Sequence, residues 1–365
     1  MQKVLAERLL RRVMDWDQQR LAEELPLLDR MANFKYDEYQ QFGPGRKFVE
    51  TLGLWLEQFD SSQREDAYEF VKGRLVYISE SEMRHLVEAA YADHIKPLLI
   101  REAAGELFLA THHLGAVAQS DAFRRSLRCS LFFGLSDGAR MDVFRRSANL
   151  DNEQVWQAYE PSSAKTEGLI GDLRKVYPKA FFGRVFLIDD FTASGISYIR
   201  KEPDGEWKGK IPKALKQFGT GGEASALFCD AGYRMTVVLY VATADAAAHI
   251  RQGLTEFCAE HVIPTVPELI TVYQLPEAIK VTDGNPTDQP FLRLADQDRY
   301  YRTAPLDKHE LKGGTKDVKR GFAGCALPLV LGHNTPNNSL YLLWGSGDDG
   351  GRGLFPRIVR HKAAG

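Results

Sequence analysis

Carboxylates and hydroxyls that could act together lie in one short stretch of the chain, VFLIDDFTASGIS at residues 185–197. Four apolar residues, typical of a buried strand, run into Asp189 and Asp190, and a small turn rich in hydroxyl side chains follows. The backbone N–H groups of such a turn converge on an anion, and a helix expected to start near Gly195 would add partial positive charge. Gly195 also lets the backbone approach a ligand closely. The stretch therefore predicts a phosphate site.

The carboxylates of this stretch need a different target, because they would repel a phosphate. Asp189 and Asp190 must serve something beside it, such as ribose hydroxyls or a divalent cation. A phosphate cradle flanked by two carboxylates is typical of a site for a ribose 5-phosphate. The residues expected to hold the phosphate are Thr192, Ala193, Ser194, Gly195, Ile196 and Ser197.

The same stretch resembles the signature of the type I phosphoribosyltransferases, in which apolar residues, an acidic pair and a Thr/Ser/Gly loop follow one another. The resemblance implies that residues 192–197 hold the 5′-phosphate of phosphoribosyl pyrophosphate and that the acidic pair, Asp189 and Asp190, contacts the ribose hydroxyls. It also implies Mg²⁺ chelated by the substrate, with no separate protein metal site. Two positions depart from the usual pattern: Ser197 replaces a Thr but keeps the hydroxyl, and Phe191 is bulkier than the usual Val or Thr.

An earlier turn, within LFFGLSDGARMD at residues 131–142, comes in the right order for the pyrophosphate loop that this family needs. Arg140 suits a pyrophosphate because its guanidinium offers forked donors. The resemblance makes Arg140 a catalytic residue together with the acidic pair, although an ordinary turn remains the alternative interpretation. The residues expected in the loop are Ser136, Asp137, Gly138, Ala139 and Arg140.

Longer stretches of the chain are similar to the large phosphoribosyltransferase-like proteins encoded near bacterial anti-phage and other conflict systems. They include NEQVW at residues 152–156 and GCALPLVLGHNTPNNSLYLLWG, which begins at Gly324. This similarity implies transfer of a phosphoribosyl group with release of pyrophosphate, hence a glycosyltransferase that acts in antiviral defence. The alternative is a non-catalytic sensor of phosphoribosyl pyrophosphate or a nucleotide, or a regulatory subunit of a defence complex. An intact cradle does not separate the two, because binding and catalysis need the same groups.

The terminal stretch places several amide and hydroxyl side chains in one turn between apolar runs. Amides can donate and accept, which suits recognition of a nucleobase edge or a ribose. We expect a hood-like segment at residues 321–345 that reads the acceptor, with an ordinary turn as the equal alternative. Trp344 is expected in the core. The candidate acceptor-binding residues are Asn334, Thr335, Asn337 and Asn338.

The elements that must position these residues follow from hydrophobic periodicity. Residues 1–125 have the spacing of helices and are expected to form a helical domain that packs on the rest of the chain or on a protein partner. Residues 126–365 are expected to form the phosphoribosyltransferase-like domain, an α/β fold with a mostly parallel sheet covered on both faces. Residues 201–222 are expected to be an insertion that could close over the site. The predicted strands are 129–136, 184–189, 235–243 and 268–275.

Composition excludes several other classes of protein. The 365 residues carry a net charge of −2, so nothing global indicates binding to nucleic acid or to an anionic membrane. The four cysteines lie far apart without a CxxC pair, which argues against a zinc site or a disulfide framework. No apolar run approaches the ~18 residues of a membrane helix, and the charged start lacks the apolar stretch of a signal peptide. We therefore expect a cytoplasmic protein whose partner is a small nucleotide-like molecule.

Overall fold

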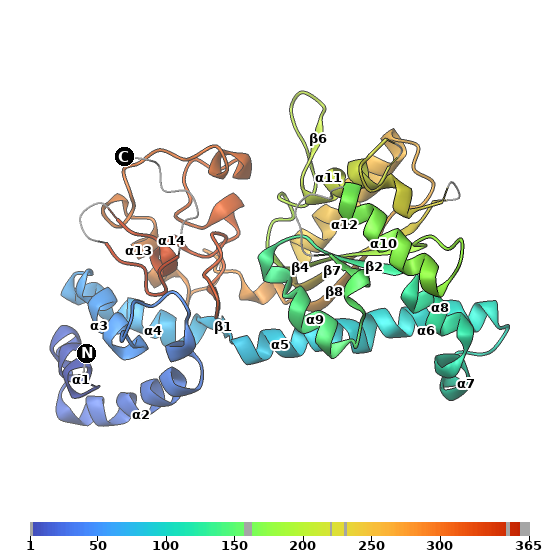
Figure 1. Cartoon of the computed structure of the whole chain (residues 1–365). Coiled ribbons are helices and arrows are strands. Elements are labelled where there is room, and N and C mark those ends of the chain that lie inside the picture. The colour runs from blue at the N-terminus through green and yellow to red at the C-terminus, as the bar shows by residue number, and fades with distance from the viewer. Residues whose placement is uncertain (1–2, 157–162, 220, 230–231, 348–350, 358–365) are drawn as a thin grey trace. The chain divides into compact units, whose positions relative to one another are not determined.

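The chain forms two compact units in a computed structural model that describes residues 3–156, 163–219, 221–229, 232–347 and 351–357 (Figure 1). The sheet unit is the continuous segment Met83–Pro276, and the split unit combines Met1–Glu82 with Glu277–Gly365. This division differs from the expected boundary near residue 125, because the C-terminal segment supplies a large part of the core around the first helices. Thr220 of the expected insertion lies outside the described residues.

A five-stranded sheet forms the centre of the sheet unit, and all of its neighbouring strands are parallel. The predicted α/β fold is confirmed, and each of the four predicted strands is present. Three of the four are buried along nearly their whole length because helices cover both faces of the sheet, whereas the strand at 268–275 lies at the edge and is partly exposed. The strands in sheet order are β3 (Val155–Trp156), β2 (Ser130–Gly134), β4 (Arg184–Thr192), β7 (Arg234–Thr243) and β8 (Glu268–Leu275).

Helices pack on the two faces of this sheet (Figure 1). On one face α10 (Ser163–Val176), α11 (Lys210–Phe218) and α12 (Ala244–Glu260) share one apolar cluster with alternate residues of the strands. On the other face the ring of Phe144 lies 5.4 Å from that of Phe132. Phe144 belongs to α9 (Met141–Ser147), and the unit also contains α6 (Lys96–Glu106), α7 (Leu114–Gln119) and α8 (Asp121–Arg128).

The segment after β4 differs from the prediction, because no helix starts at Gly195. A single turn is followed by the hairpin of β5 (Arg200–Lys201) and β6 (Trp207–Lys208), and α11 begins only after it. The amide of Lys210 donates to the carbonyl of Ser197 over 3.1 Å, and the amide of Ile211 donates to that of Tyr198 over 3.0 Å. The two ends of the hairpin segment are therefore hydrogen-bonded to each other, so the hairpin is an insertion between the turn and the start of α11.

The split unit joins its two chain segments through a shared core. The strand β1 (Val76–Ile78) pairs in parallel with β9 (Leu329–Leu331). The indole N–H of Trp55 donates to the carbonyl of Leu342 over 2.8 Å, and the ring of Phe70 stacks on Phe291. The N-terminal helices are α1 (Lys3–Met14), α2 (Gln18–Phe34), α3 (Phe48–Glu57) and α4 (Arg64–Arg74), and the C-terminal ones are α13 (Gln289–Ala295) and α14 (Tyr341–Trp344).

A capping box marks the start of α5 (Glu80–Ala89), which a π-helical stretch (Ala90–Ile95) connects to α6. The amide of Ser79 donates to the Glu82 carboxylate over 2.8 Å, and the amide of Glu82 donates to the Ser79 hydroxyl over 3.1 Å. These reciprocal bonds satisfy two donors that a helix start would otherwise leave unpaired.

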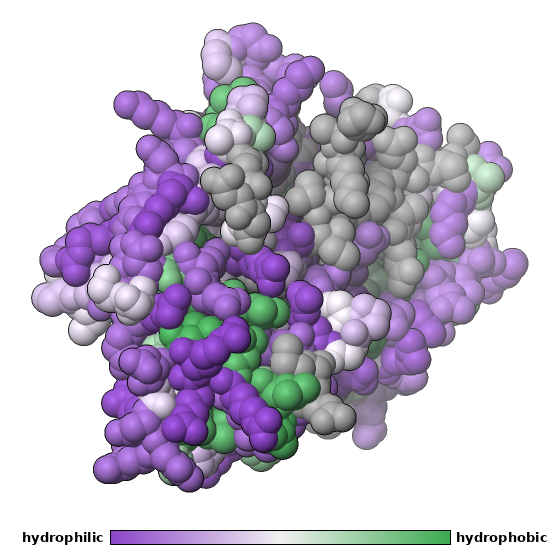
Figure 2. All heavy atoms as spheres, turned by 90° about the vertical axis from the view of Figure 1, so that its left-hand side faces the viewer, coloured by the Kyte–Doolittle hydropathy of each residue, from purple (hydrophilic) through white to green (hydrophobic). Residues whose placement is uncertain are grey.

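The face of the molecule in Figure 2 is mostly hydrophilic, and its largest group of hydrophobic residues lies in the lower central part of the view. Exposed apolar side chains of its first helices include Val4, Leu5 and Leu27. The protein partner expected for the N-terminal helices stays a prediction. Among the residues that the structure describes, no helix combines the length and apolar character that a membrane crossing requires.

Candidate active site

The two loops with candidate site residues meet at one edge of the sheet. Because β2 and β4 are parallel neighbours, their carboxyl ends lie side by side, and the turn after each strand projects from the same edge. The Ser136 hydroxyl donates to Oδ1 of Asp189. A Cβ placed on Gly138 would overlap the carboxylate of Asp190. The structure therefore brings the expected pyrophosphate loop into direct contact with the acidic pair.

Asp189 is fully buried, and three segments donate to its carboxylate. Besides Ser136, the hydroxyl of Tyr198 donates to Oδ2 over 2.7 Å, and the ammonium of Lys210 forms an ion pair with the same oxygen. Burial raises the pKa of the Asp189 carboxyl; the Lys210 charge acts to lower it, and the neighbouring Asp190 adds to the rise. The carboxylate thus ties the β2 loop, the turn after β4 and the start of α11 to one another.

Asp190 has a different environment from its neighbour. Successive side chains of a strand point to opposite faces, so the two carboxylates of β4 diverge. Asp190 is half-buried, and its Oδ1 accepts the amide of Phe191 over 2.9 Å. Of the acidic pair, Asp190 is therefore the member that lies beside Gly138 and retains access to solvent.

The turn of residues 192–197 is braced from within and from the next strand. The Thr192 hydroxyl accepts the amide of Gly195 over 3.1 Å. The Thr243 hydroxyl, at the end of β7, donates to the carbonyl of Ala193 over 2.7 Å. Thr192 and Ala193 are buried, whereas Ser194, Ile196 and Ser197 are partly exposed. The exposed hydroxyls of this turn are thus those of the two serines.

Gly195 is required by both backbone conformation and packing. Its φ is +74°, a region that side-chain-bearing residues rarely adopt. An added Cβ would lie 2.8 Å from Cδ2 of His249 and 3.0 Å from the carbonyl oxygen of Ala246. The glycine therefore lets the turn pack against α12, in addition to any approach to a ligand.

The β2 loop is also fixed by the sheet. The buried Tyr240 hydroxyl of β7 donates to the carbonyl of Ala139 over 2.7 Å. Arg140 adopts a left-handed conformation with φ of 47°, and its Nη1 donates to the carbonyl of Gly138 over 3.2 Å. Asp137 is exposed at the tip of the loop. The loop thus holds its guanidinium close to its own backbone.

The candidate acceptor segment belongs to the split unit, and part of it serves the fold. Thr335 is fully buried, and its hydroxyl bonds with the Tyr39 hydroxyl and donates to the Phe355 carbonyl, both over 2.9 Å. The Asn338 amide donates to the carbonyl of Phe322 over 3.3 Å. Asn334 and Asn337 are partly exposed, although the side-chain oxygen of Asn334 is itself buried. Trp344 is buried in the core, as predicted.

Replacing Thr335 with valine should lower the free energy of unfolding of the split unit by about 1–3 kcal/mol, because buried partners of the hydroxyl would remain unsatisfied. Urea denaturation followed by tryptophan fluorescence measures this loss. Asn337→Ala is the matched control in the same turn, with an expected change within about 0.5 kcal/mol. Equal stability of Thr335→Val and wild type would show that the hydroxyl has no structural role.

Sequence reasoning missed Lys210 and Tyr198, which complete the environment of Asp189. Lys210 lies in the basic run KGKIPKALK (208–216), a pattern typical of a solvated helix face. The signal that could have found it is Gly209, which precedes the helix with a φ of +128° and marks a tight return of the chain. Tyr198 directly follows the turn of residues 192–197, where a hydroxyl can reach back to the strand.

A sequence model of the family described as PRTase-CE matches residues 53–357, which contain both loops and the terminal segment. The chain belongs to the PRTase-CE family. It is therefore a phosphoribosyltransferase-like protein, and membership implies a small-molecule phosphoribosyl substrate. No curated protein and no solved structure shows a significant match to the chain.

The candidate site can be compared with the ligand sets that hold metal ions in proteins. Within the described part of the chain, no group of three or more His, Cys, Asp or Glu side chains could hold a metal ion. A cation at this site would need most of its ligands from a bound substrate.

Proposed function

We propose that this PRTase-CE protein binds phosphoribosyl pyrophosphate, or a related ribose 5-phosphate ligand, at the carboxyl edge of β2 and β4. We further propose that it transfers the phosphoribosyl group and releases pyrophosphate. The contact between Ser136 and Asp189 carries the proposal, because it joins the two loops that such a ligand must bridge.

The two aspartates of the acidic pair have different roles in this proposal. Asp190, half-buried beside Gly138, meets the ribose hydroxyls. Asp189 is a positioning residue, since its carboxylate is buried and already accepts from three side chains. The turn of residues 192–197 holds the 5′-phosphate through backbone N–H groups and its exposed serine hydroxyls. Arg140 holds the pyrophosphate with its forked donors.

The transfer step displaces pyrophosphate from C1 of the ribose. The lone pair of an acceptor nucleophile forms the new bond to C1 as the C1–O bond breaks, and that electron pair leaves with the pyrophosphate. Positive charge develops on the ribose ring, and the fixed carboxylate of Asp190 offsets it without reorganisation. The acceptor contacts expected from the sequence, Asn334 and Asn337, belong to the split unit and stay a prediction.

Magnesium fits the donor set of this site in its substrate-chelated form. Mg²⁺ is commonly held by one or two carboxylates together with substrate phosphates. Asp190 is the half-buried carboxylate that would complete such a shell. When bound, the cation would neutralise charge on the leaving pyrophosphate.

A sensor of the same ligand is the second candidate function. The split unit contains nearly half of the chain, and most of it has no part in the transfer step. Such a unit suits a protein that reports ligand binding to a partner. In either form we propose a role in bacterial defence, on the resemblance of the sequence alone.

Calorimetric titration of the full chain with phosphoribosyl pyrophosphate and Mg²⁺ tests the site. We expect Asp190→Asn to weaken binding by about 100-fold, since a charged hydrogen-bond acceptor to the ribose is lost. Asp142→Asn, an exposed carboxylate on the neighbouring α9, should bind like wild type. Absence of binding to the wild type would overturn the proposed function, and tight binding by Asp190→Asn would overturn the role of that carboxylate.

Pyrophosphate release separates the two candidate functions. We expect the wild type to release pyrophosphate when a suitable base or nucleotide is present, and EDTA to abolish the release. Tight binding without release across a broad panel of acceptors would instead establish the sensor.

A further inference from the structure

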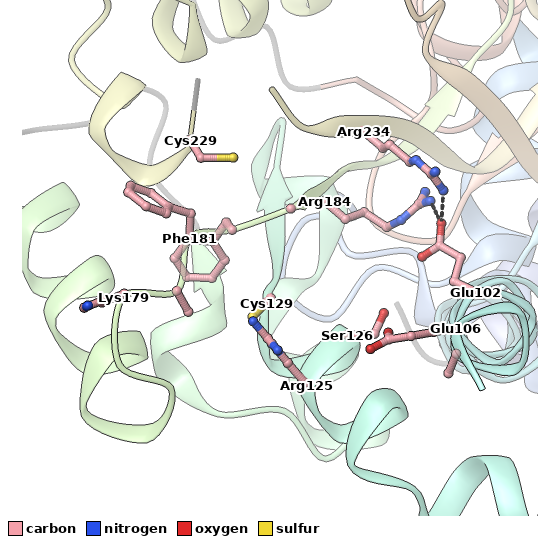
Figure 3. Close-up of a pocket in the computed structure, with 14 residues that line it drawn as sticks. Glu102, Glu106, Arg125, Ser126, Cys129, Lys179, Phe181, Arg184, Cys229 and Arg234 are labelled. Atoms are coloured by element: carbon pink, nitrogen blue, oxygen red, sulfur yellow. Dashed lines mark hydrogen bonds and ion pairs between the residues drawn. The ribbon is translucent and has the colours of Figure 1, made fainter. Parts of the chain in front are cut away.

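A pocket of about 620 Å³ lies at the amino ends of the strands, the edge opposite to the sugar-phosphate loops (Figure 3). Arg184 begins β4 and Arg234 begins β7, whereas the phosphate turn follows the other end of β4. In parallel sheets the reaction takes place at the carboxyl edge. The charge collected in this pocket is therefore not explained by the proposed transfer.

Two arginines form one wall of the pocket. Arg184 and Arg234 are register partners on adjacent parallel strands, so their side chains emerge on the same face. Glu102 of α6 accepts from both through Oε1, with a distance of 2.8 Å to Nη1 of Arg234 (Figure 3). The Arg184 side chain is nine-tenths buried and also donates to the Thr236 hydroxyl over 3.0 Å. A single carboxylate thus pairs with a buried guanidinium, that of Arg184, and with a largely exposed one, that of Arg234.

Two further cations line the pocket from other segments. Arg125 comes from α8, and Lys179 comes from the loop before β4. Neither forms an ion pair with a carboxylate of the described residues. With Glu102 and Glu106 as the acidic lining residues, four cations face two carboxylates, a local excess of +2. Charges of one sign in a concave surface raise the local concentration of the opposite ion.

The remaining wall is apolar and aromatic. Phe181 is half-buried, and its ring lies among the lining residues in Figure 3. The guanidinium of Arg174 lies 4.6 Å from the centre of that ring and helps to fix it. The volume falls within the ~300–1,000 Å³ typical of small-molecule sites and exceeds the needs of a lone phosphate. The lining suits a compound that combines several negative charges with a flat ring.

We propose that this pocket binds a nucleotide at a second site, separate from the sugar-phosphate loops. Arg125 and Lys179 bind its phosphates, and Phe181 lies against its base. The guanidinium of Arg234 also binds the phosphates, which displace Glu102 from it. Occupancy of the site therefore loosens the link between α6 and the sheet.

Titration of the full chain with ATP, AMP and tripolyphosphate at constant ionic strength tests this proposal. We expect ATP to bind the wild type and the double variant Arg125→Ala/Lys179→Ala to bind it at least about tenfold more weakly, since two charge-assisted contacts are lost. The matched control, Arg124→Ala/Lys175→Ala, removes the same charge from exposed positions outside the pocket and should bind ATP like wild type.

Three results would overturn the proposal that this pocket is a second site for a nucleotide. Equal weakening in the two double variants would show an unspecific charge effect. Loss of ATP binding in Asp190→Asn, with no loss in the pocket variant, would place the nucleotide at the sugar-phosphate loops. Tripolyphosphate binding as tight as that of ATP would remove the role of the ring.

Alkylation of Cys229 gives an independent readout, because this exposed thiol lines the pocket (Figure 3). We expect saturating ATP to slow its reaction with a maleimide several-fold. Cys229→Ser identifies the signal, and Cys129 contributes little to it because burial raises the pKa of its thiol. An unchanged rate at saturating ATP would contradict occupancy of the pocket.

Discussion

Lys210→Met should destabilise the sheet unit by about 3 kcal/mol at neutral pH, because it leaves the buried Asp189 carboxylate without its ion-pair partner. Urea denaturation of the full chain measures the loss as a lower midpoint for the transition of the sheet unit. The paired variant Asp189→Asn/Lys210→Met removes both charges and should recover most of the stability. A single variant as stable as wild type would contradict the role of Lys210.

The loss should depend on pH. Asp190, Tyr198, Tyr240 and Ser136 face the Asp189 carboxyl besides Lys210. Burial raises its folded-state pKa, and removal of the ammonium lets that pKa rise further. A carboxyl with a raised folded-state pKa stabilises the fold at pH values below its ordinary, unfolded-state pKa. This contribution is lost as the pH rises through the raised folded-state pKa. The gap between Lys210→Met and wild type should therefore widen from acidic to neutral pH.

Gly195→Ala should reduce binding of phosphoribosyl pyrophosphate by about 100-fold and lower the unfolding free energy by about 2 kcal/mol. The new Cβ meets the His249 ring and the Ala246 carbonyl of α12 and must adopt a positive φ. The turn has to move, and its N–H groups would lose their alignment with the proposed 5′-phosphate. Calorimetric titration and urea denaturation measure the two effects.

Gly205→Ala is a control that separates the effect of a positive φ from the effect of close packing in Gly195→Ala. Gly205 also has a positive φ, +86°, but an added Cβ there would meet nothing within 4 Å. We expect a loss of about 1 kcal/mol and unchanged ligand binding, since this glycine lies in the β5–β6 hairpin. Similar binding defects in both variants would show that the phosphate turn does not depend on its contact with α12.

Four of the five strands of the parallel sheet could be predicted from the sequence, because each is a largely apolar run that needs no long-range information. The fifth, β3, has only two residues and gives no such signal. The divergence of Asp189 from Asp190 could be expected from strand alternation, but which of them faces inward depends on how the helices cover the sheet. The partnership of Asp189 with Lys210 could not be predicted. It depends on a hairpin that brings the start of α11 back beside the turn after β4. The spacing of residues in the sequence does not show that these two segments are close.

Which chain segments make up each unit could not be predicted from the sequence either. The strands β1 and β9 are three residues each, too short to give a periodic signal, and they lie about 250 residues apart in the chain. The helical pattern of the first 125 residues therefore appeared to be one domain, although it contributes to two. Thr335 and Asn338 appeared to be ligand contacts because turn residues and buried structural residues share the same polar side chains.

The pairing of β1 with β9 affects how the protein is made. The sheet unit is contiguous and can fold as soon as it emerges from the ribosome, whereas the first helices must wait for their C-terminal partners. At ~5–20 residues per second, that wait lasts on the order of ten seconds or more. During synthesis the first helices can pack on one another, but the part of their apolar surface that the C-terminal segment covers in the finished protein stays exposed.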